Sequence, residues 1–328
     1  MPLQAASAAH YHLAPQNRAA KYGAYSPVAL TDFGLVAGVL TNNTTETSYA
    51  YFSEGKFFSE DDFCGTIDAP GNTGLNGISL DAALTYTVGV CYGTHFGYVY
   101  NQAANTTTKV QYPSAVSTFP YGVNANGVTV GEFIGPPTQG FSLVNGTYAP
   151  INAPGAYYTV ALGVNAENAI FGNYYTSLSG YFGYLLAVTG LFTTINYPGS
   201  TFTQLAGLND QNMAVGLYEN ATGPLHAFGW QNDTYFEAPL PKGSSSRATA
   251  VNDNGDVAGW YVDSSGDEYG FVWNPTTNQL VKVKGPEGSK FIIVTGINNT
   301  HAQITGSYNS STGETIGFIG TCTGTSCF

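Results

Sequence analysis

The chain has 328 residues, with 9 Lys or Arg against 21 Asp or Glu, so its formal net charge is −12. Charged residues make up 9% of the chain, where an ordinary globular domain has about 25%, while glycine (41), Tyr (24) and Phe (19) are abundant. The aromatic residues exclude a disordered chain, nine cations are too few for a nucleic-acid-binding face, and no apolar run approaches the roughly 18 residues of a membrane-spanning helix. We therefore expect an acidic all-β protein with no nucleic-acid partner and no membrane span.

The first residues are typical of the end of a secretory leader. Ala6-Ser7-Ala8 has the A-x-A form that signal peptidase cleaves. We expect residues 1–8 to be the remnant of such a leader, or alternatively an ordinary flexible terminus. Residues 9–328 are expected to form a single domain.

Asparagine sequons of the form N-x-[ST] are dense along the chain. A sequon accepts an N-linked glycan when it lies on the surface of a protein in the secretory pathway. The sequence therefore predicts a secreted glycoprotein. The candidate glycosylation sites are Asn42, Asn43, Asn105, Asn145, Asn220, Asn232, Asn298 and Asn309.

Four cysteines, an even number, favour disulfide bonds formed in an oxidising compartment. Four cysteines allow three connectivities, and spacing alone does not decide among them. We favour the local arrangement, in which Cys322 pairs with Cys327 across a short loop and Cys64 pairs with Cys91. Together with the sequons, this predicts a protein that is secreted or resides in the secretory pathway.

One sequence pattern recurs along most of the chain. A clear copy is Ala250-Val-Asn-Asp-Asn-Gly-Asp-Val-Ala-Gly-Trp-Tyr261, in which two apolar runs flank a turn. Internal repeats of this length indicate solenoids or propellers. The glycine that ends the second run lies at Gly38, Gly89, Gly131, Gly172, Gly216, Gly259 and Gly306, at intervals of 51, 42, 41, 44, 43 and 47 residues.

Each repeat holds four short apolar runs separated by turns that contain Gly, Asn, Asp or Pro. Runs rich in Val, Ile, Tyr, Phe and Thr predict strands, and Asn and Gly tolerate the positive φ of tight turns. Units of about 40–45 residues with four strands are typical of propeller blades. The repeats therefore predict a seven-bladed β-propeller with four antiparallel strands in each blade.

The two ends of the chain indicate how the ring closes. The last repeat ends at Ile319 after its third strand and lacks a fourth. Residues 9–15 form a surplus apolar segment, His10-Tyr-His-Leu-Ala-Pro15, before the first repeat. We predict that this segment is the outer strand of the last blade, because such pairing closes the ring and removes exposed strand edges.

The inner strand of each blade lines the central channel of a propeller, and these strands differ from repeat to repeat. Arg247, one of two arginines, could hold an anionic group with its planar fork of donors. Alternatively, Arg247 caps strand-end carbonyls, the tyrosines only pack, and the amides serve turns. The predicted catalytic residues are Arg247, Tyr121 and Gln204, and the predicted substrate-binding residues are Asn72, Asn76, Tyr22, Tyr157, Tyr158, Phe119 and Thr249.

Familiar catalytic and metal-binding motifs are missing from the sequence. It contains no G-x-S-x-G, H-E-x-x-H or phosphate-binding loop. Asn252-Asp-Asn-Gly-Asp256 resembles part of a calcium loop, but the distal Glu is absent and a plain turn is favoured. We expect no metal and no cofactor.

Two family resemblances follow from these residues. The pattern in Gly207–Gly229, which includes His226-Ala227-Phe228, resembles the extracellular repeat family named for its His-Ala-Phe signature. This resemblance covers nearly all of residues 20–319 and implies the propeller fold, although Thr31 and Ser79 replace the Asn of the repeat. It implies nothing specific about activity.

The second resemblance is to the fungal propeller proteins of tropolone-sesquiterpenoid pathways, which are intermolecular hetero-Diels–Alderases. It implies that a hydroxymethyl-tropolone loses water to give an ortho-quinone methide, which then adds across an alkene of humulene or a similar terpene. The partners would be these small apolar substrates, and no cofactor is needed to hold two reactants together and polarise one of them. In this hypothesis Arg247 binds the tropolone oxygens, Gln204 and Asn76 support it, and tyrosines stack on the substrates.

Two other functions remain open at this point. A secreted glycan-binding propeller would repeat one polar site in several blades, whereas the inner strands here differ. A polysaccharide hydrolase or lyase would need a facing pair of carboxylates, and Asp and Glu lie mostly in turns. The sequence therefore favours one asymmetric site.

Overall fold

The computed structural model describes residues 10–15, 22–42, 48–54, 57–61, 63–67, 73–79, 84–177, 180–221, 223–300 and 303–323. The leader segment 1–8, the sequon at Asn43, the predicted binding residue Asn72 and Cys327 lie outside these residues. The described residues form β-strands and one short 3₁₀ helix, η1 (Gly65–Ile67), so the all-β prediction is confirmed. No helix in the described part of the chain has the length and apolar character needed to cross a membrane.

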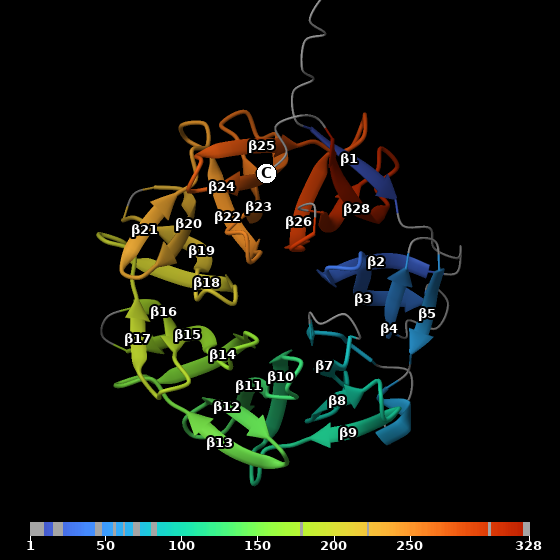
Figure 1. Ribbon diagram of the computed structural model, residues 1–328, viewed down its shortest axis with the longest axis vertical. Helices are drawn as coiled ribbons and strands as arrows, with labels where there is room; N and C mark the ends of the chain where they lie inside the picture. The colour runs from blue at the N-terminus through green and yellow to red at the C-terminus, as the bar shows by residue number, and fades with distance from the viewer. Residues whose placement is uncertain are drawn as a thin grey trace, which may run out of the picture.

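The strands follow one another in antiparallel sheets arranged in a ring (Figure 1). The first three sheets each have four strands in chain order, as the repeats predict. They are β2 (Tyr22–Leu30), β3 (Leu35–Asn42), β4 (Ser48–Glu54) and β5 (Phe57–Asp61); β6 (Gly77–Ile78), β7 (Tyr86–Val90), β8 (Gly97–Asn101) and β9 (Thr106–Val110); and β10 (Ser117–Val123), β11 (Thr129–Ile134), β12 (Gln139–Val144) and β13 (Thr147–Ile151).

The next sheet has eight strands, and its two halves are joined by one parallel residue pair, Tyr181 with Phe202. Within each half the pairing is antiparallel. The halves are β14 (Tyr158–Val164), β15 (Ile170–Thr176), β16 (Gly180–Leu186) and β17 (Phe192–Ile195), and β18 (Phe202–Leu208), β19 (Ala214–Glu219), β20 (Leu225–Gln231) and β21 (Thr234–Glu237).

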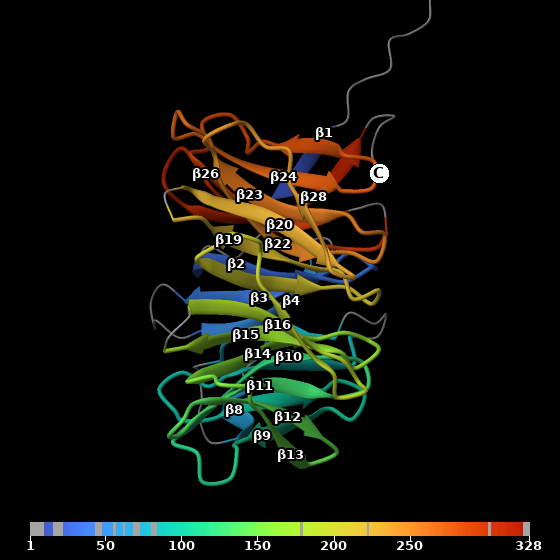
Figure 2. The same ribbon diagram turned by 90° about the vertical axis from the view of Figure 1, so that its left-hand side faces the viewer.

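The last two sheets again have four strands each, and the final one takes its outer strand from the N-terminal end of the chain. Seen edge-on, the strands run across the thickness of the ring, from one face to the other (Figure 2). The strands are β22 (Ser245–Val251), β23 (Val257–Val262), β24 (Glu268–Asn274) and β25 (Gln279–Val283), and β26 (Phe291–Ile297), β27 (Ile304–Asn309), β28 (Thr315–Thr323) and β1 (His10–Pro15).

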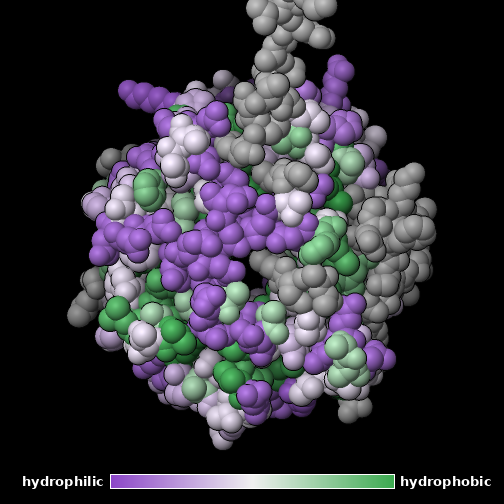
Figure 3. All heavy atoms as spheres, viewed as in Figure 1, coloured by the Kyte–Doolittle hydropathy of each residue, from purple (hydrophilic) through white to green (hydrophobic). Residues whose placement is uncertain are grey.

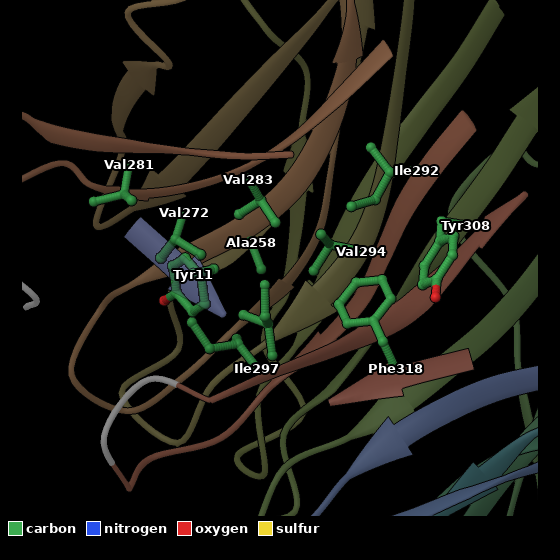
Figure 4. Packing of buried hydrophobic residues seen from close by; sticks show 11 residues of the cluster. Tyr11, Ala258, Val272, Val281, Val283, Ile292, Val294, Ile297, Tyr308 and Phe318 are labelled. Carbon is green, nitrogen blue, oxygen red and sulfur yellow. The ribbon is translucent and has the colours of Figure 1, made fainter. Parts of the chain in front are cut away.

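The N-terminal strand pairs as the sequence predicts. β1 lies antiparallel to β28, from His10 opposite Thr323 to Pro15 opposite Phe318. β28 continues to Thr323, past the Ile319 at which the repeat pattern ends. The Tyr11 ring lies in an apolar cluster with Val272 and other side chains of the preceding sheet and of its own sheet (Figure 4). This strand therefore joins the last sheet to the one before it.

The ring also closes between the last sheet and the first. The Thr295 hydroxyl donates to the carbonyl of Pro27 at 3.3 Å, and the Asn298 amide donates to the carbonyl of Thr31 at 3.2 Å. The backbone N–H of Asn299 donates to the Asp32 carboxylate at 2.6 Å. Segments 267 or 268 residues apart are thus hydrogen-bonded neighbours.

Replacing Tyr11 by alanine should destabilise the ring strongly. Tyr11 is 7% exposed, and truncating a buried aromatic residue costs roughly 3–5 kcal/mol in transfer energy and cavity formation. His12, next to it on the same strand, is exposed and provides the matched control. Urea unfolding should give a much lower free energy of unfolding for Tyr11→Ala than for His12→Ala. Equal losses would show that β1 does not stabilise the ring through this contact.

Candidate functional site

A cavity of about 480 Å³ lies where the inner strands of the sheets converge. Its wall includes residues of β2, β6, β10, β14, β18, β22 and β26, so it occupies the centre of the ring. Hydrophilic residues border part of the central opening on the face shown in Figure 3. The sequence prediction that inner strands surround the central space is confirmed by this lining.

A β-bulge shapes the wall of the cavity. Most inner strands carry one extra residue that is skipped in the pairing with the next strand, and Asn76 holds the same place ahead of the short strand β6. A bulged residue has no partner in the ladder, so its side chain can leave the plane of the sheet. Every one of these residues lines the cavity: Val28, Asn76, Tyr121, Leu162, Ala206, Thr249 and Thr295.

The bulge explains the repeated glycine. At Gly131, a Cβ atom would overlap the carbonyl oxygen of Phe119, and at Gly259 it would overlap that of Arg247. The same clash recurs at other glycines of the repeat because the bulge brings this carbonyl against the second strand. Only glycine permits that close approach. The repeat glycine is thus a requirement of the inner wall.

Three polar bulge residues bind the backbone of the next sheet. The Asn76 amide donates to the carbonyl of Pro120 at 2.8 Å, and the Thr249 hydroxyl donates to that of Val294 at 2.8 Å. Thr295 makes the equivalent bond to the first sheet. Asn76 and Thr249 therefore line the cavity as predicted, but their hydrogen bonds serve the contact between sheets.

Tyr121 is the exception among the bulge residues because its hydroxyl meets a carboxylate. The Tyr121 hydroxyl donates to Glu132 Oε1 at 2.8 Å, and the Tyr158 hydroxyl donates to Glu132 Oε2 at 2.6 Å. Glu132 is 9% exposed. Burial, together with the charge and hydrogen bond of Glu132, raises the pKa of both tyrosines above the usual value. The network joins the third sheet to the fourth at the cavity wall.

Glu132 was not singled out by the sequence analysis, although the repeat carries a signal for it. It directly follows the repeat glycine Gly131 on β11, next to the inner strand. This position lies opposite Phe119 in the ladder and close to the cavity wall. The residues that follow the repeat glycines are Val39, Val90, Glu132, Asn173, Leu217, Trp260 and Ser307, among which Glu132 alone is charged.

Further aromatic side chains lie near Tyr158, at one end of the hydrogen-bond network that Tyr121, Glu132 and Tyr158 form. Burial and the Glu132 charge raise the pKa of Tyr181, whose ring lies 5.1 Å from that of Phe202. Tyr157, directly before β14, and Tyr175, near the end of β15, are 69% and 38% exposed. The Tyr157 N–H donates to the carbonyl of Tyr175, so the two lie side by side. An exposed aromatic surface therefore flanks Tyr158.

Amides and carboxylates border the other part of the cavity. In several consecutive sheets, the side chain of a turn asparagine donates a hydrogen bond to a backbone carbonyl of the next sheet. We call these residues, Asn124, Asn165, Asn209, Asn252 and Asn298, the asparagine chain. Asp32, Asp210 and Asp253 line the cavity beside it, and burial together with these neighbouring charges raises the pKa of Asp210. The chain runs from Asn124 to Asn165, Asn209, Asn252, Asn298 and Thr31.

The other predicted site residues lie elsewhere. Arg247 is exposed, and its guanidinium lies 5.5 Å from the Trp260 ring, outside the cavity lining. Gln204 and Phe119 are half-buried on β18 and β10 and do not line the cavity either. Tyr22 begins β2. The structure thus brings Tyr121, Asn76 and Thr249 together at the cavity and joins Tyr158 to them through Glu132.

Within the described residues, no group of three or more His, Cys, Asp or Glu is arranged to hold a metal.

The predicted disulfide between Cys64 and Cys91 is confirmed, with Cα atoms 5.6 Å apart. Cys322 is also disulfide-bonded. Among the sequons, Asn298 needs correction: it is 2% exposed and its Nδ2 donates to Thr31 and Gln303, so a glycan on that nitrogen is incompatible with the closed ring. Asn42 lies at the end of β3 and Asn309 is half-buried at the end of β27, whereas the exposed sequons are Asn105, Asn145, Asn220 and Asn232.

No protein-family model and no curated protein sequence matches the chain. Solved structures do match. The β-propeller domain of the Trilobed protease from Pyrococcus furiosus has a TM-score of 0.61 at 10% identity, with 93% of this chain and 94% of that chain covered. The acylaminoacyl peptidase of Pyrococcus horikoshii has a TM-score of 0.60 at 9% identity, with 91% of this chain and 51% of that chain covered. An extracellular domain of a hybrid two-component system from B. thetaiotaomicron has a TM-score of 0.55 at 12% identity, with 94% of this chain and 39% of that chain covered.

These similarities establish the fold as a β-propeller. At 9–12% identity they carry no information about activity. The chain spans about half the length of the prolyl endopeptidase and acylaminoacyl peptidase chains that it matches. Function must therefore be argued from the cavity itself.

The Glu132 network should make the protein sensitive to alkali. Tyrosines of the unfolded chain ionise near pH 10, whereas Tyr121 and Tyr158 have raised pKa values in the folded state. Above about pH 10 the unfolded chain therefore binds fewer protons, and the free energy of unfolding falls as the pH rises. A Tyr121→Phe/Tyr158→Phe double variant should lose less stability than the unmodified protein between about pH 9 and pH 11.

Urea unfolding at each pH, followed by circular dichroism, measures this difference. Tyr92→Phe is the matched control because Tyr92 is 49% exposed and does not line the cavity. It should show the pH dependence of the unmodified protein. If the double variant shows that same dependence, the two phenols do not keep their protons as the geometry implies.

Proposed function

We propose that the ring is a seven-bladed propeller of the His-Ala-Phe repeat type. One parallel residue pair joins the halves of the eight-stranded sheet, and each half has its own inner strand with a bulge, at Leu162 and Ala206. Counting these halves as two blades agrees with the repeat in the sequence. His226, Ala227 and Phe228 lie on β20, where Ala227 and Phe228 are buried against neighbouring strands.

We propose that the protein is a cofactor-independent pericyclase, an intermolecular hetero-Diels–Alderase that joins a tropolone ortho-quinone methide to a humulene-type sesquiterpene. The observation that carries this proposal is the asymmetry of the cavity. Equivalent bulge positions present different side chains, and Tyr121 alone among them pairs with a carboxylate. A glycan-binding propeller, the alternative, is expected to repeat one polar site.

The cavity offers both surfaces that the reaction requires. Val28, Leu162 and Ala206 provide an apolar wall at three bulge positions. Transfer of a terpene from water to this wall is favourable because apolar surface is buried. Tyr121 and Glu132 provide one polar group at which a tropolone oxygen can be held. Holding two reactants in one orientation supplies much of the rate enhancement of an addition step.

The dehydration step can use the same polar group. The tropolone O–H proton passes to Tyr121 while the Tyr121 proton passes to Glu132. The C–O bond of the hydroxymethyl group breaks, and its oxygen takes a proton from the Tyr121 hydroxyl, which takes the proton back from Glu132, and leaves as water. The resulting quinone methide adds across the alkene, and the Tyr121 O–H stabilises the charge that develops on its oxygen.

We also propose that the protein works in or beyond the secretory pathway. The Cys64–Cys91 disulfide supports this, because such bonds persist in oxidising compartments. The exposed positions of Asn105, Asn145, Asn220 and Asn232 are compatible with N-linked glycans.

Incubation with a hydroxymethyl-tropolone precursor and humulene tests the proposed reaction. Chiral chromatography with mass detection should show one adduct enantiomer, formed faster than with heat-inactivated protein. Tyr121→Phe should lower the rate by about a hundredfold, the effect typical of losing a proton-transfer group. Tyr92→Phe should keep the full rate.

Arg247→Ala separates this arrangement from the one expected on sequence grounds. If Tyr121 and Glu132 hold the tropolone oxygen, the variant should retain its rate and enantiomer. A loss equal to that of Tyr121→Phe would return Arg247 to the catalytic role. A racemic adduct at the rate of the inactivated protein would reject the pericyclase, and a glycan array would then test the alternative function.

A further inference from the structure

Four aromatic residues stand in register across four neighbouring strands of the eight-stranded sheet, β14, β15, β16 and β18 (Figure 1). Tyr158 lies opposite Tyr175, and Tyr175 lies opposite Tyr181. Tyr181 in turn pairs with Phe202, across the junction of the two halves. The ring centroids are 6.0 Å apart for Tyr175 and Tyr181 and 5.1 Å apart for Tyr181 and Phe202. Residues opposite each other in a ladder share one face of the sheet, so these four residues form a continuous aromatic row across the strands.

The aromatic row is open to solvent at the ends of these strands. Tyr175 is 38% exposed, and Tyr158, Tyr181 and Phe202 are half-buried. Tyr157, directly before β14, adds a side chain that is 69% exposed. Contiguous exposed aromatic surface on a folded protein marks a place where another molecule binds.

The packing of the ring does not require this row. The same three strand ends in other sheets carry residues of other kinds, although those sheets pack against their neighbours in the same way. The corresponding residues are Ser245, Val262 and Glu268 in the sheet β22–β25, and Phe291, Asn309 and Thr315 in the last sheet. The row is therefore a local feature that calls for a local explanation.

The surroundings of the row are almost free of charge. Residues 110–200 contain Glu132 and Glu167 as their only charged side chains. Glu132 is buried behind Tyr158, and Glu167 lies in the turn between β14 and β15, at the opposite ends of these strands from the row. Glu219, opposite Phe202, is the exposed carboxylate at one end of the row. An anionic polymer would be repelled here and a cationic one would find a single partner, so the surface fits an uncharged ligand.

The chemistry of the row favours a sugar chain over a peptide. An extended peptide binds a sheet through an unpaired strand edge, but β15 is paired on both sides by β14 and β16. A tyrosine offers an apolar ring face and a hydroxyl that donates and accepts hydrogen bonds. A sugar ring offers the complementary combination, with C–H groups on its faces and hydroxyls around its edge. A flat chain of sugar rings can therefore contact successive members of the row.

We propose that the aromatic row binds a linear, uncharged, β-1,4-linked polysaccharide, whose sugar rings stack on Tyr175, Tyr181 and Phe202. The row lies outside the cavity lining, so this inference does not rest on the proposed reaction. It also differs from the alternative function, in which one polar site would recur in several blades, because the row occurs in one place.

Cellohexaose and cellobiose are suitable probes, because the hexasaccharide is long enough to contact the whole row and the disaccharide is not. Isothermal titration of the full chain should give cellohexaose a Kd lower than that of cellobiose by about tenfold or more, since each additional stacked ring adds to the affinity. Tyr175→Ala and Tyr181→Ala should each raise the Kd of cellohexaose by about tenfold. Phe33→Ala is the matched control and should leave it unchanged, because Phe33 is 69% exposed in the turn between β2 and β3.

The comparison of the two probes on the unmodified protein needs no variant, so it holds even if Tyr181→Ala fails to fold. Absence of cellohexaose binding, or equal affinities for the two sugars, would overturn the proposal. It would also be overturned if Tyr175→Ala binds cellohexaose as the unmodified protein does. Self-association that Tyr175→Ala abolishes, without any binding of cellohexaose, would instead assign the row to contact with a second copy of the chain. Adduct formation is measured with different substrates, so its failure leaves this test intact and the reverse is also true.

Discussion

Mutual burial of the sheets is the constraint on which the rest of the molecule depends. A four-stranded sheet of this kind has two apolar faces and can bury them only against its neighbours. The apolar clusters therefore span adjacent sheets, as Val215 of β19 and Val257 of β23 do. The series ends without an exposed face because β1 completes the last sheet and Asn298 binds the first. The central space exists because inner strands standing around a ring cannot all reach its axis.

The bulge converts this space into a cavity with individual chemistry. The backbone is the same in successive sheets because the carbonyl of a residue such as Phe119 lies against a repeat glycine such as Gly131. The side chain of the bulged residue takes no part in that contact. Its identity can therefore differ from sheet to sheet, and at Tyr121 it meets Glu132 from the neighbouring strand. Structural repetition and a single asymmetric polar group thus coexist in one ring.

The fold could be predicted from the sequence because its determinants are local and repeated. The glycine spacing, the Asn-rich turns and the surplus strand at residues 10–15 each indicate their own place in the ring. The site could be predicted only in part, since proximity to an inner strand does not fix where a side chain points. Arg247 and Tyr121 both lie on inner strands, but only Tyr121 stands at the bulge and lines the cavity. Asn298 shows the same limit, because its sequon gives no sign that a cross-sheet hydrogen bond occupies its nitrogen.

Some bulge residues hold neighbouring sheets together and others only line the cavity, and this difference determines where the sequence of such a protein can change. Asn76, Thr249 and Thr295 each hold a neighbouring sheet, so most replacements there would weaken the ring. Val28, Leu162 and Ala206 face the same cavity with aliphatic side chains, which cannot form such bonds. Evolution or an engineer can therefore reshape one part of the wall while the other keeps the scaffold intact. Ligand preference in this architecture can drift through aliphatic positions without first acquiring a compensating stabilising mutation.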